Sequence, residues 1–161
     1  MARIDNEIRV TPSVLDRLID LDPRSSHEAV RTRSASLRDL RDAVRRDLEW
    51  LLNTRCYAEN VDDLLEEAPR SVAFYGLPDF TGLAAKNASE QKRLATAVET
   101  ALNYFEPRFL DLKVTLEPIS NIDRQMKFHI EARLDVEPAP EPIAFDTVLE
   151  LGKGEFIVTE K

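Results

Sequence analysis

The residue types that carry out metal or nucleophile chemistry are few in this chain and widely separated. The two histidines are His27 and His129, and neither has a cysteine or another histidine at metal-ligand spacing. Neither Ser71 nor Cys56 lies in a recognisable nucleophile motif, and the four glycines form no phosphate-binding loop. We expect His129 to be an ordinary surface histidine, because it falls on the polar side of an alternating pattern. The residues predict no catalytic group, no metal site and no cofactor.

Carboxylates are the one catalytic residue type that is abundant. The chain has 30 aspartate and glutamate residues. Glycoside hydrolysis needs two carboxylates at a set separation, one of them with a raised pKa. With so many acids a pair at that separation would arise by chance, so the count neither supports nor excludes a hydrolase.

One acid and one base stand out because of where they lie. Glu106, Pro107 and Arg108 follow a predicted helix and precede a predicted strand. Pro107 cannot continue a helix and pushes Glu106 toward extended geometry. In an unbroken extended chain, Glu106 and Arg108 would lie on the apolar side of that strand.

Two interpretations of this charged pair are open. In the first, which the composition favours, Pro107 ends the helix and both charges reach water. In the second, the pair is held rigidly at a helix–strand corner and offered to complementary groups of a partner. A buried, unpaired charge would cost several kcal/mol. Burial would therefore require that Glu106 and Arg108 satisfy each other or that a partner does so.

The composition is that of a soluble globular chain. Of its 161 residues, 43% are hydrophobic and 32% are charged, which suits one folded domain. The net charge of −8 argues against nonspecific binding to nucleic acid. No segment has the length of a membrane span, and the first residues do not resemble a secretory signal. The single cysteine fits a reducing compartment, so we expect a cytoplasmic protein that inserts into no membrane.

Two long helices and one short helix are expected. Apolar residues recur at helical spacing up to Asn53, starting near Ser34 or Ser36, both of which are good N-caps. Ser89 is expected to cap a second helix that runs to the Glu-Pro-Arg corner. Residues 1–33 are predicted to be an N-terminal arm with a short helix. This arm either packs on its own domain or serves as a hook for a partner.

The C-terminal third alternates between apolar and polar residues, as half-buried strands do. Strands are predicted over residues 110–117, 126–136, 143–151 and 155–159. The fold class is therefore α+β, with helices packed on one face of a mostly antiparallel C-terminal sheet and with an N-terminal arm.

The last predicted strand contains Phe156, Ile157 and Val158, which are strongly β-prone. If this strand lies at an edge of the sheet, its backbone can accept a strand from another protein. If it lies inside the sheet, that idea fails.

Several stretches of the chain resemble one protein family. They are Asp47–Arg55, Ser71–Asp79, Phe105–Arg108, Pro12–Leu18 and Val136–Pro142. In their order along the chain, these stretches are similar to TssE, the small baseplate wedge subunit of bacterial type VI secretion systems. The wider family includes the wedge subunit of contractile phage tails, long labelled lysozyme-like. The resemblance spans nearly the whole chain and implies an arm over residues 1–33 and a wedge domain over residues 34–161.

The resemblance implies a structural, non-enzymatic subunit of a membrane-docked cytoplasmic baseplate. Its implied partners are the TssF–TssG wedge and the contractile TssB–TssC sheath, whose assembly such subunits start; TssK and the spike or hub are further candidates. The implied partner-binding residues are Glu106, Pro107 and Arg108 for the wedge, and Phe156, Ile157 and Val158 for the sheath.

Two alternatives come from other functional classes. The old family label suggests a peptidoglycan hydrolase, although the sequence shows no catalytic constellation beneath that label. A generic helix–sheet interaction module, whose arm binds an unrelated partner, is the third hypothesis.

Overall fold

The computed structural model describes residues 10, 12–19, 23–24, 33–57, 65–80, 87–117, 125–150 and 153–160. His27 lies outside these ranges. The helices are α1 (Val14–Leu18), α2 (Arg33–Asn53) and α3 (Ala88–Phe105), with 3-10 turns at Ala68–Arg70 and Val72–Phe74. Of the predicted arm, α1 is the described helix, and the division into arm and domain stays a prediction.

Four strands follow the helices. They are β1 (Phe109–Leu116), β2 (Gln125–Leu134), β3 (Glu141–Glu150) and β4 (Glu155–Glu160). They lie side by side in the order β1-β2-β3-β4, and each is antiparallel to the next. The α+β class is therefore confirmed, and β1 and β4 are the two edges of this sheet.

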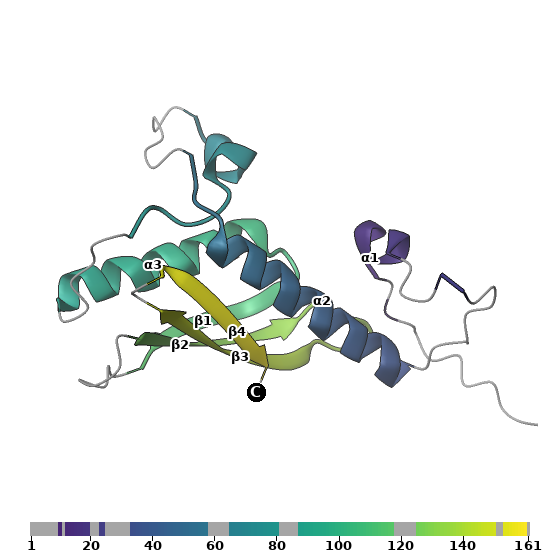
Figure 1. Cartoon of the computed structure of the whole chain (residues 1–161). Coiled ribbons are helices and arrows are strands. Elements are labelled where there is room, and N and C mark those ends of the chain that lie inside the picture. The colour runs from purple at the N-terminus through teal and green to yellow at the C-terminus, as the bar shows by residue number, and fades with distance from the viewer. Residues whose placement is uncertain are drawn as a thin grey trace, which may run out of the picture.

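The two long helices share one hydrophobic core with the sheet (Figure 1). Helix α2 packs mainly on β4, and α3 packs mainly on β1. Side chains along β2 and β3 alternate, with the buried set entering this core. The largest fully buried side chains include Leu48, Leu52, Leu94, Leu102, Phe128 and Phe145. Burying each contributes about 1.5–3 kcal/mol, and together they hold both helices against the sheet.

Both predicted helix starts need correction. Helix α2 begins at Arg33, so Ser34 and Ser36 are helical residues rather than N-caps, and Ser36 is buried. In α3 the cap is Asn87, whose Oδ1 accepts hydrogen bonds from the Ser89 backbone N–H at 3.0 Å and from Ser89 Oγ at 2.8 Å. Asparagine is as good an N-cap as serine, so the residue types alone did not distinguish the two positions.

A bulge in β1 changes which side chains share its inner face. Phe109 pairs with Leu134, and Leu110 pairs with Arg133, but the next pair joins Lys113 to Glu131. Two residues of β1 therefore stand opposite one residue of β2, and Asp111 has a positive φ of 52°. Beyond this bulge the register of β1 is shifted by one residue. Leu110 shares the outer face with its partner Arg133, although its spacing from Leu112 would place both on one face of a regular strand, and Phe109 packs on the core.

A tight turn at Gly76 ties the segment after α2 to the core. Its φ is +109°, and an added Cβ would lie 2.4 Å from the Thr54 carbonyl oxygen, so no other residue fits without displacement. The fully buried Leu77 follows, and its backbone N–H donates to the same Thr54 oxygen at 2.9 Å.

Candidate docking corner and sheet edge

The corner between α3 and β1 is fixed through its backbone. The Glu106 N–H donates to the Leu102 carbonyl at 2.9 Å and closes the helix, while the Glu106 carbonyl accepts from the Phe109 N–H at 3.2 Å. The Arg108 carbonyl accepts from the Asp135 N–H at 2.9 Å, which ties the corner to the end of β2. Three elements therefore hold Glu106 and Arg108 in place.

Glu106 and Arg108 pair with each other in the free chain. Arg108 Nε lies 2.5 Å from Glu106 Oε1, and Arg108 Nη2 lies 2.5 Å from Glu106 Oε2. This bidentate geometry is the strongest arrangement for an arginine and a carboxylate. Glu106 is only 4% exposed. The interpretation in which both charges reach water is therefore wrong for Glu106. The bulge also shifts the register of β1 after Leu110, so the charged pair before it does not lie on the apolar face of the strand that follows.

Asp47 of α2 completes the pairing from the other side. Arg108 Nη2 donates to Asp47 Oδ2 at 2.8 Å. Arg46, next to Asp47, donates to Asp47 Oδ1 through Nε at 3.1 Å and Nη2 at 2.8 Å. Asp47 therefore bridges two arginines and links α2 to the corner at the end of α3.

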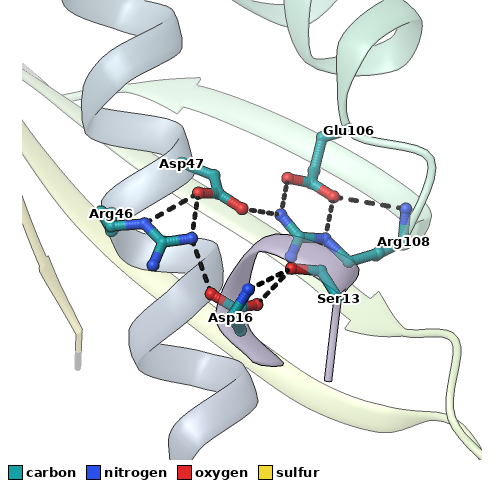
Figure 2. Close-up of polar contacts among 6 residues, drawn as sticks. All are labelled: Ser13, Asp16, Arg46, Asp47, Glu106 and Arg108. Atoms are coloured by element: carbon teal, nitrogen blue, oxygen red, sulfur yellow. Dashed lines mark hydrogen bonds and ion pairs between the residues drawn. The ribbon is translucent and has the colours of Figure 1, made fainter. Parts of the chain in front are cut away.

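The short helix α1 joins the same network (Figure 2). Arg46 Nη2 lies 2.9 Å from Asp16 Oδ1, and Ser13 caps α1 by accepting the Asp16 N–H at 3.1 Å. The alternating chain of charges runs from Asp16 to Arg46, Asp47, Arg108 and Glu106. We call these five residues the corner network.

The network changes the proton affinity of its members. Burial alone would lower the pKa of Arg108, but its hydrogen bonds and charge interactions with Glu106, and then with Asp47, raise it. Burial would raise the pKa of Asp16, but hydrogen bonds with Ser13 and Arg46 lower it below its ordinary value. Burial, followed by the charges of Asp47 and Glu106, raises the pKa of the nearby Tyr75 hydroxyl. All these groups therefore keep their neutral-pH protonation states.

Part of the corner is left accessible. Nε and Nη2 of Arg108 are engaged, whereas its Nη1 has no hydrogen-bond partner among the described residues, and the side chain is 26% exposed. Pro107 is exposed on the same turn. Trp50, one turn along α2, is 53% exposed and stacks under Arg46 at 5.0 Å. This surface offers arginine N–H donors beside two exposed rings.

The second predicted site, on β4, is arranged differently. The side chains of Phe156 and Val158 are buried in the core, at 3% and 2% exposure, whereas that of Ile157 is 47% exposed on the outer face. Since β4 is an edge strand, the condition for strand addition is met. Of the three predicted residues, Ile157 alone is exposed to a partner, and the other exposed residues of β4 are Glu155, Thr159 and Glu160.

His129 lies on the outer face of the sheet, between two acids. Its Nδ1 is 2.6 Å from Asp146 Oδ1, and its Nε2 is 3.2 Å from Glu131 Oε1. Among the described residues, no group of three or more histidine, cysteine, aspartate or glutamate side chains has the geometry to hold a metal ion.

Sequence reasoning missed four residues of these sites: Asp16, Arg46 and Asp47 of the corner network, and Asn53 beside β4. Asp47 lies 61 positions before Arg108, so no local spacing links them. Asn53 was identified only as a helix end, yet its side chain hydrogen-bonds to the backbone of Phe156 in β4. The family resemblance alone pointed to Asp47 and Asn53, through the Asp47–Arg55 stretch, and to Asp16, through the Pro12–Leu18 stretch, and nothing in the sequence pointed to Arg46.

Comparison with known protein families gives a match over most of the chain. The model of the family described as baseplate wedge protein gp25 matches residues 38–139, which include the Glu106–Arg108 corner, most of α2 and all of α3, but neither β3 nor β4. The chain belongs to this family. Its role is therefore that of a structural component of a phage-tail-like baseplate, associated with other baseplate proteins. Searches of curated proteins and of solved structures gave no significant match. No helix in the described part of this gp25-family chain is long and apolar enough to cross a membrane.

Proposed function

We propose that this gp25-family chain is the TssE-type baseplate subunit of a bacterial type VI secretion system. It docks on the TssF–TssG wedge through Glu106, Pro107 and Arg108, and it starts TssB–TssC sheath assembly through β4. In this proposal it is cytoplasmic, sits at a membrane-docked baseplate, and has TssK and the spike or hub as further neighbours.

The docking proposal rests on one observation: at an exposed corner, both carboxylate oxygens of the buried Glu106 bind the guanidinium of Arg108. Glu106 is 4% exposed, and it holds the Arg108 guanidinium in one orientation by two short contacts. The remaining Nη1 donors therefore point from a fixed position, which lowers the ordering cost of a partner contact. Carboxylates or backbone carbonyls of the wedge are suitable acceptors.

The edge position of β4 supports the sheath proposal. Strand addition to an edge draws its affinity from main-chain hydrogen bonds. Such a surface tolerates different side chains in the added strand. It therefore suits a subunit to which the first sheath proteins would add a strand.

A matched pair of variants tests the docking. A single charge reversal is a poor test, because it leaves one buried charge unpaired and disturbs the fold. In the double variant Glu106→Leu/Arg108→Met, both charges are replaced together by apolar side chains of similar size. We expect this variant to fold and to lose co-purification with TssF–TssG.

The control is Arg133→Met, which removes a more exposed arginine whose ion pair with Asp111 lies on β2 and β1. We expect this control to co-purify normally. Normal co-purification of the double variant, with an unfolding curve like that of the parent chain, would show that the pair is only structural.

The hydrolase alternative has its own test. We expect the purified chain to leave the turbidity of cell-wall sacculi unchanged over time. A steady loss of turbidity that follows the protein through purification would contradict the structural role.

A further inference from the structure

The two edges of the sheet are covered to different extents. At β4, Phe156 and Val158 turn their side chains into the core and are 3% and 2% exposed. At β1, the side chains of Leu112, Val114 and Leu116 also pack against the core, yet these three residues remain partly exposed. The border of the core along β1 is therefore less well covered than the border along β4.

The backbone of β1 has open hydrogen-bonding groups on the side away from β2. Glu117 donates its N–H to the Lys127 carbonyl at 2.9 Å, so the groups of Glu117 point toward β2. In an antiparallel pair, the backbone groups of successive residues point alternately toward the neighbouring strand and away from it. Those of Leu116 and Val114 therefore... point away from β2, and neither residue has a hydrogen bond on that side among the described residues.

The first half of β1 has no such open stretch. The Phe109 N–H already donates to the Glu106 carbonyl at 3.2 Å. The bulge then interrupts the ladder between Leu110 and Lys113, and a bulge turns an edge strand out of regular pairing. The open stretch of the edge is therefore Lys113–Glu117.

This open stretch is complementary to itself in antiparallel pairing. Its sequence is Lys113, Val114, Thr115, Leu116 and Glu117. When two copies pair with Thr115 opposite Thr115, each Lys113 stands opposite Glu117 of the other copy. Each Val114 then stands opposite Leu116 of the other copy.

Backbone and side chains both favour this register. The outward N–H and C=O groups of Val114 and Leu116 meet, so the two backbones exchange hydrogen bonds. Lys113 and Glu117 are exposed and form no ion pair with another described residue, and opposite charges that face each other across two strands stabilise the pairing. A second copy therefore supplies partners for the backbone and for the charged side chains of this edge.

The helices allow two sheets to join at β1. Pairing of this kind has a twofold axis perpendicular to the sheet, so the helices of both copies lie on the same face. A helix is about 10 Å wide and neighbouring strands are about 4.8 Å apart, so α2 and α3 match the width of the four-stranded sheet beneath them (Figure 1). The two copies of α3 come to lie side by side and cover the partly exposed Val114 and Leu116.

The opposite edge determines the size of the assembly. At β4, Asn53 of α2 bonds to the N–H and the C=O of Phe156, at 2.8 and 2.9 Å, and Val158 is buried. This edge therefore offers a second copy no stretch like Lys113–Glu117. With one such edge in each described sheet, pairing ends at a dimer and does not continue into a fibre.

We propose that the free chain forms a symmetric dimer through β1, with the stretch Lys113–Glu117 paired to the same stretch of a second copy. The two sheets become one continuous sheet, with the helices of both copies on one face. This dimer goes beyond the proposed baseplate function and requires neither the wedge nor the sheath proteins.

Sedimentation velocity of the full chain over a range of concentrations tests the dimer. We expect the parent chain to shift from monomer to dimer as its concentration rises. In Thr115→Glu and in Thr115→Lys, like charges face each other at the twofold axis, where opposite residues lie closest, so we expect the dissociation constant to rise about fivefold or more. An equimolar mixture of these two variants places opposite charges at the axis and should dimerise at least as tightly as the parent chain.

The matched controls are Thr159→Glu and Thr159→Lys, which make the same changes at an exposed threonine of β4. Each control alone should keep the dissociation constant of the parent chain to within about twofold. Urea unfolding of all four variants checks that each of them is folded.

Hydrogen exchange at the Val114 and Leu116 amides locates the interface. We expect their protection to rise with chain concentration in the parent chain, and to rise less in Thr115→Glu. A parent chain that stays monomeric at its highest soluble concentration, or a dimer that is as tight in Thr115→Glu as in the parent chain, would overturn the proposal. A monomeric chain in which these two amides become protected only when TssB–TssC proteins are added would also overturn it, and would show that β1 takes a strand of another protein.

Discussion

The corner network and the β4 edge are both candidate docking surfaces, but they are built from different parts of the chain. At the corner, the groups that a partner could contact are charged side chains, and nearly every charge already has an internal partner. At the edge, the proposed contacts are made by backbone groups, and Phe156 and Val158 are buried, with their side chains in the core. Side chains thus close the corner, whereas at the edge Asn53 of α2 bonds to the backbone of Phe156, Val158 is 2% exposed, and Glu160 is exposed.

This difference decides how each surface responds to mutation. A side-chain site with a buried carboxylate is sensitive to single substitutions, because removing one partner leaves the other uncompensated. A backbone site is insensitive to most side-chain changes and responds chiefly to proline or to a residue such as Asn53 that covers it. Stability and docking are therefore coupled at the corner and separable at the edge.

The largest effect is expected from breaking the corner pair on one side. Arg108→Ala leaves Glu106 buried without its guanidinium, and we expect the free energy of unfolding to fall by about 3 kcal/mol. The measurement is equilibrium unfolding in urea. The double variant Glu106→Leu/Arg108→Met should lie within about 1 kcal/mol of the parent chain. A double variant as unstable as Arg108→Ala would mean that the charges themselves, rather than their balance, stabilise the corner.

Prolines placed on β4 should separate folding from strand addition. Glu160→Pro removes an outward N–H, so the sheet stays intact and we expect sheath assembly to be impaired. Thr159→Pro removes an N–H that faces β3, and we expect it to cost about 2 kcal/mol of stability. Urea unfolding and TssB–TssC assembly are measured on both variants. Equal destabilisation by the two prolines would contradict this alternation, which follows from the hydrogen bonds of the Phe156 N–H and C=O to Asn53, on the side away from β3.

The elements of this fold could largely be predicted from sequence periodicity. The alternation in β2 marks its buried face correctly, since Met126, Phe128, Ile130 and Leu134 are all buried. The bulge at Asp111 was not predicted, because one inserted residue leaves the apolar alternation nearly unchanged. Exact helix starts were also missed, since several residues in each region are equally good caps.

The two sites were less predictable than the fold for a physical reason. Glu106 and Arg108 are two residues apart, so their pairing was one of the alternatives that the sequence left open. The contacts of Asp47 with Arg108, and of Asn53 with Phe156, cross 61 and 103 positions. Such contacts arise only when helix α2 is placed over the sheet, and nothing in the local spacing encodes that placement.

A smaller effect is expected from the residue that bridges the two arginines. Asp47→Asn weakens the pairs with Arg46 and Arg108, and we expect the free energy of unfolding to fall by about 1 kcal/mol, since these groups are partly exposed. The matched control is Asp42→Asn, an exposed position on the same helix, expected to stay within about 0.5 kcal/mol. A loss of unfolding free energy as large as that of Arg108→Ala would mean that Asp47, rather than the Glu106–Arg108 pair, contributes most of the stability of the corner network.

The smallest effect is the release of α1 from the corner by acid. The pKa of Asp16 is lowered below its ordinary value of 3.8 in the folded chain. For a carboxyl group with a lowered pKa, the stabilising contact is fully present above the unfolded value and is lost as the pH falls through the folded value. The contact of Asp16 with Arg46 should therefore hold at neutral pH and disappear below about pH 3.8.

The single tryptophan reports this release, because Arg46 stacks on Trp50 and also binds Asp16. We expect a change in Trp50 fluorescence with a midpoint below 3.8, separate from the unfolding seen by far-ultraviolet circular dichroism. Asp16→Asn should abolish that step and leave global stability within about 0.5 kcal/mol of the parent chain. An unchanged fluorescence step in Asp16→Asn would mean that another acid, such as Asp47, controls the environment of Trp50. In that case the corner network would be held together by α2 and the turn between α3 and β1, without a contribution from α1.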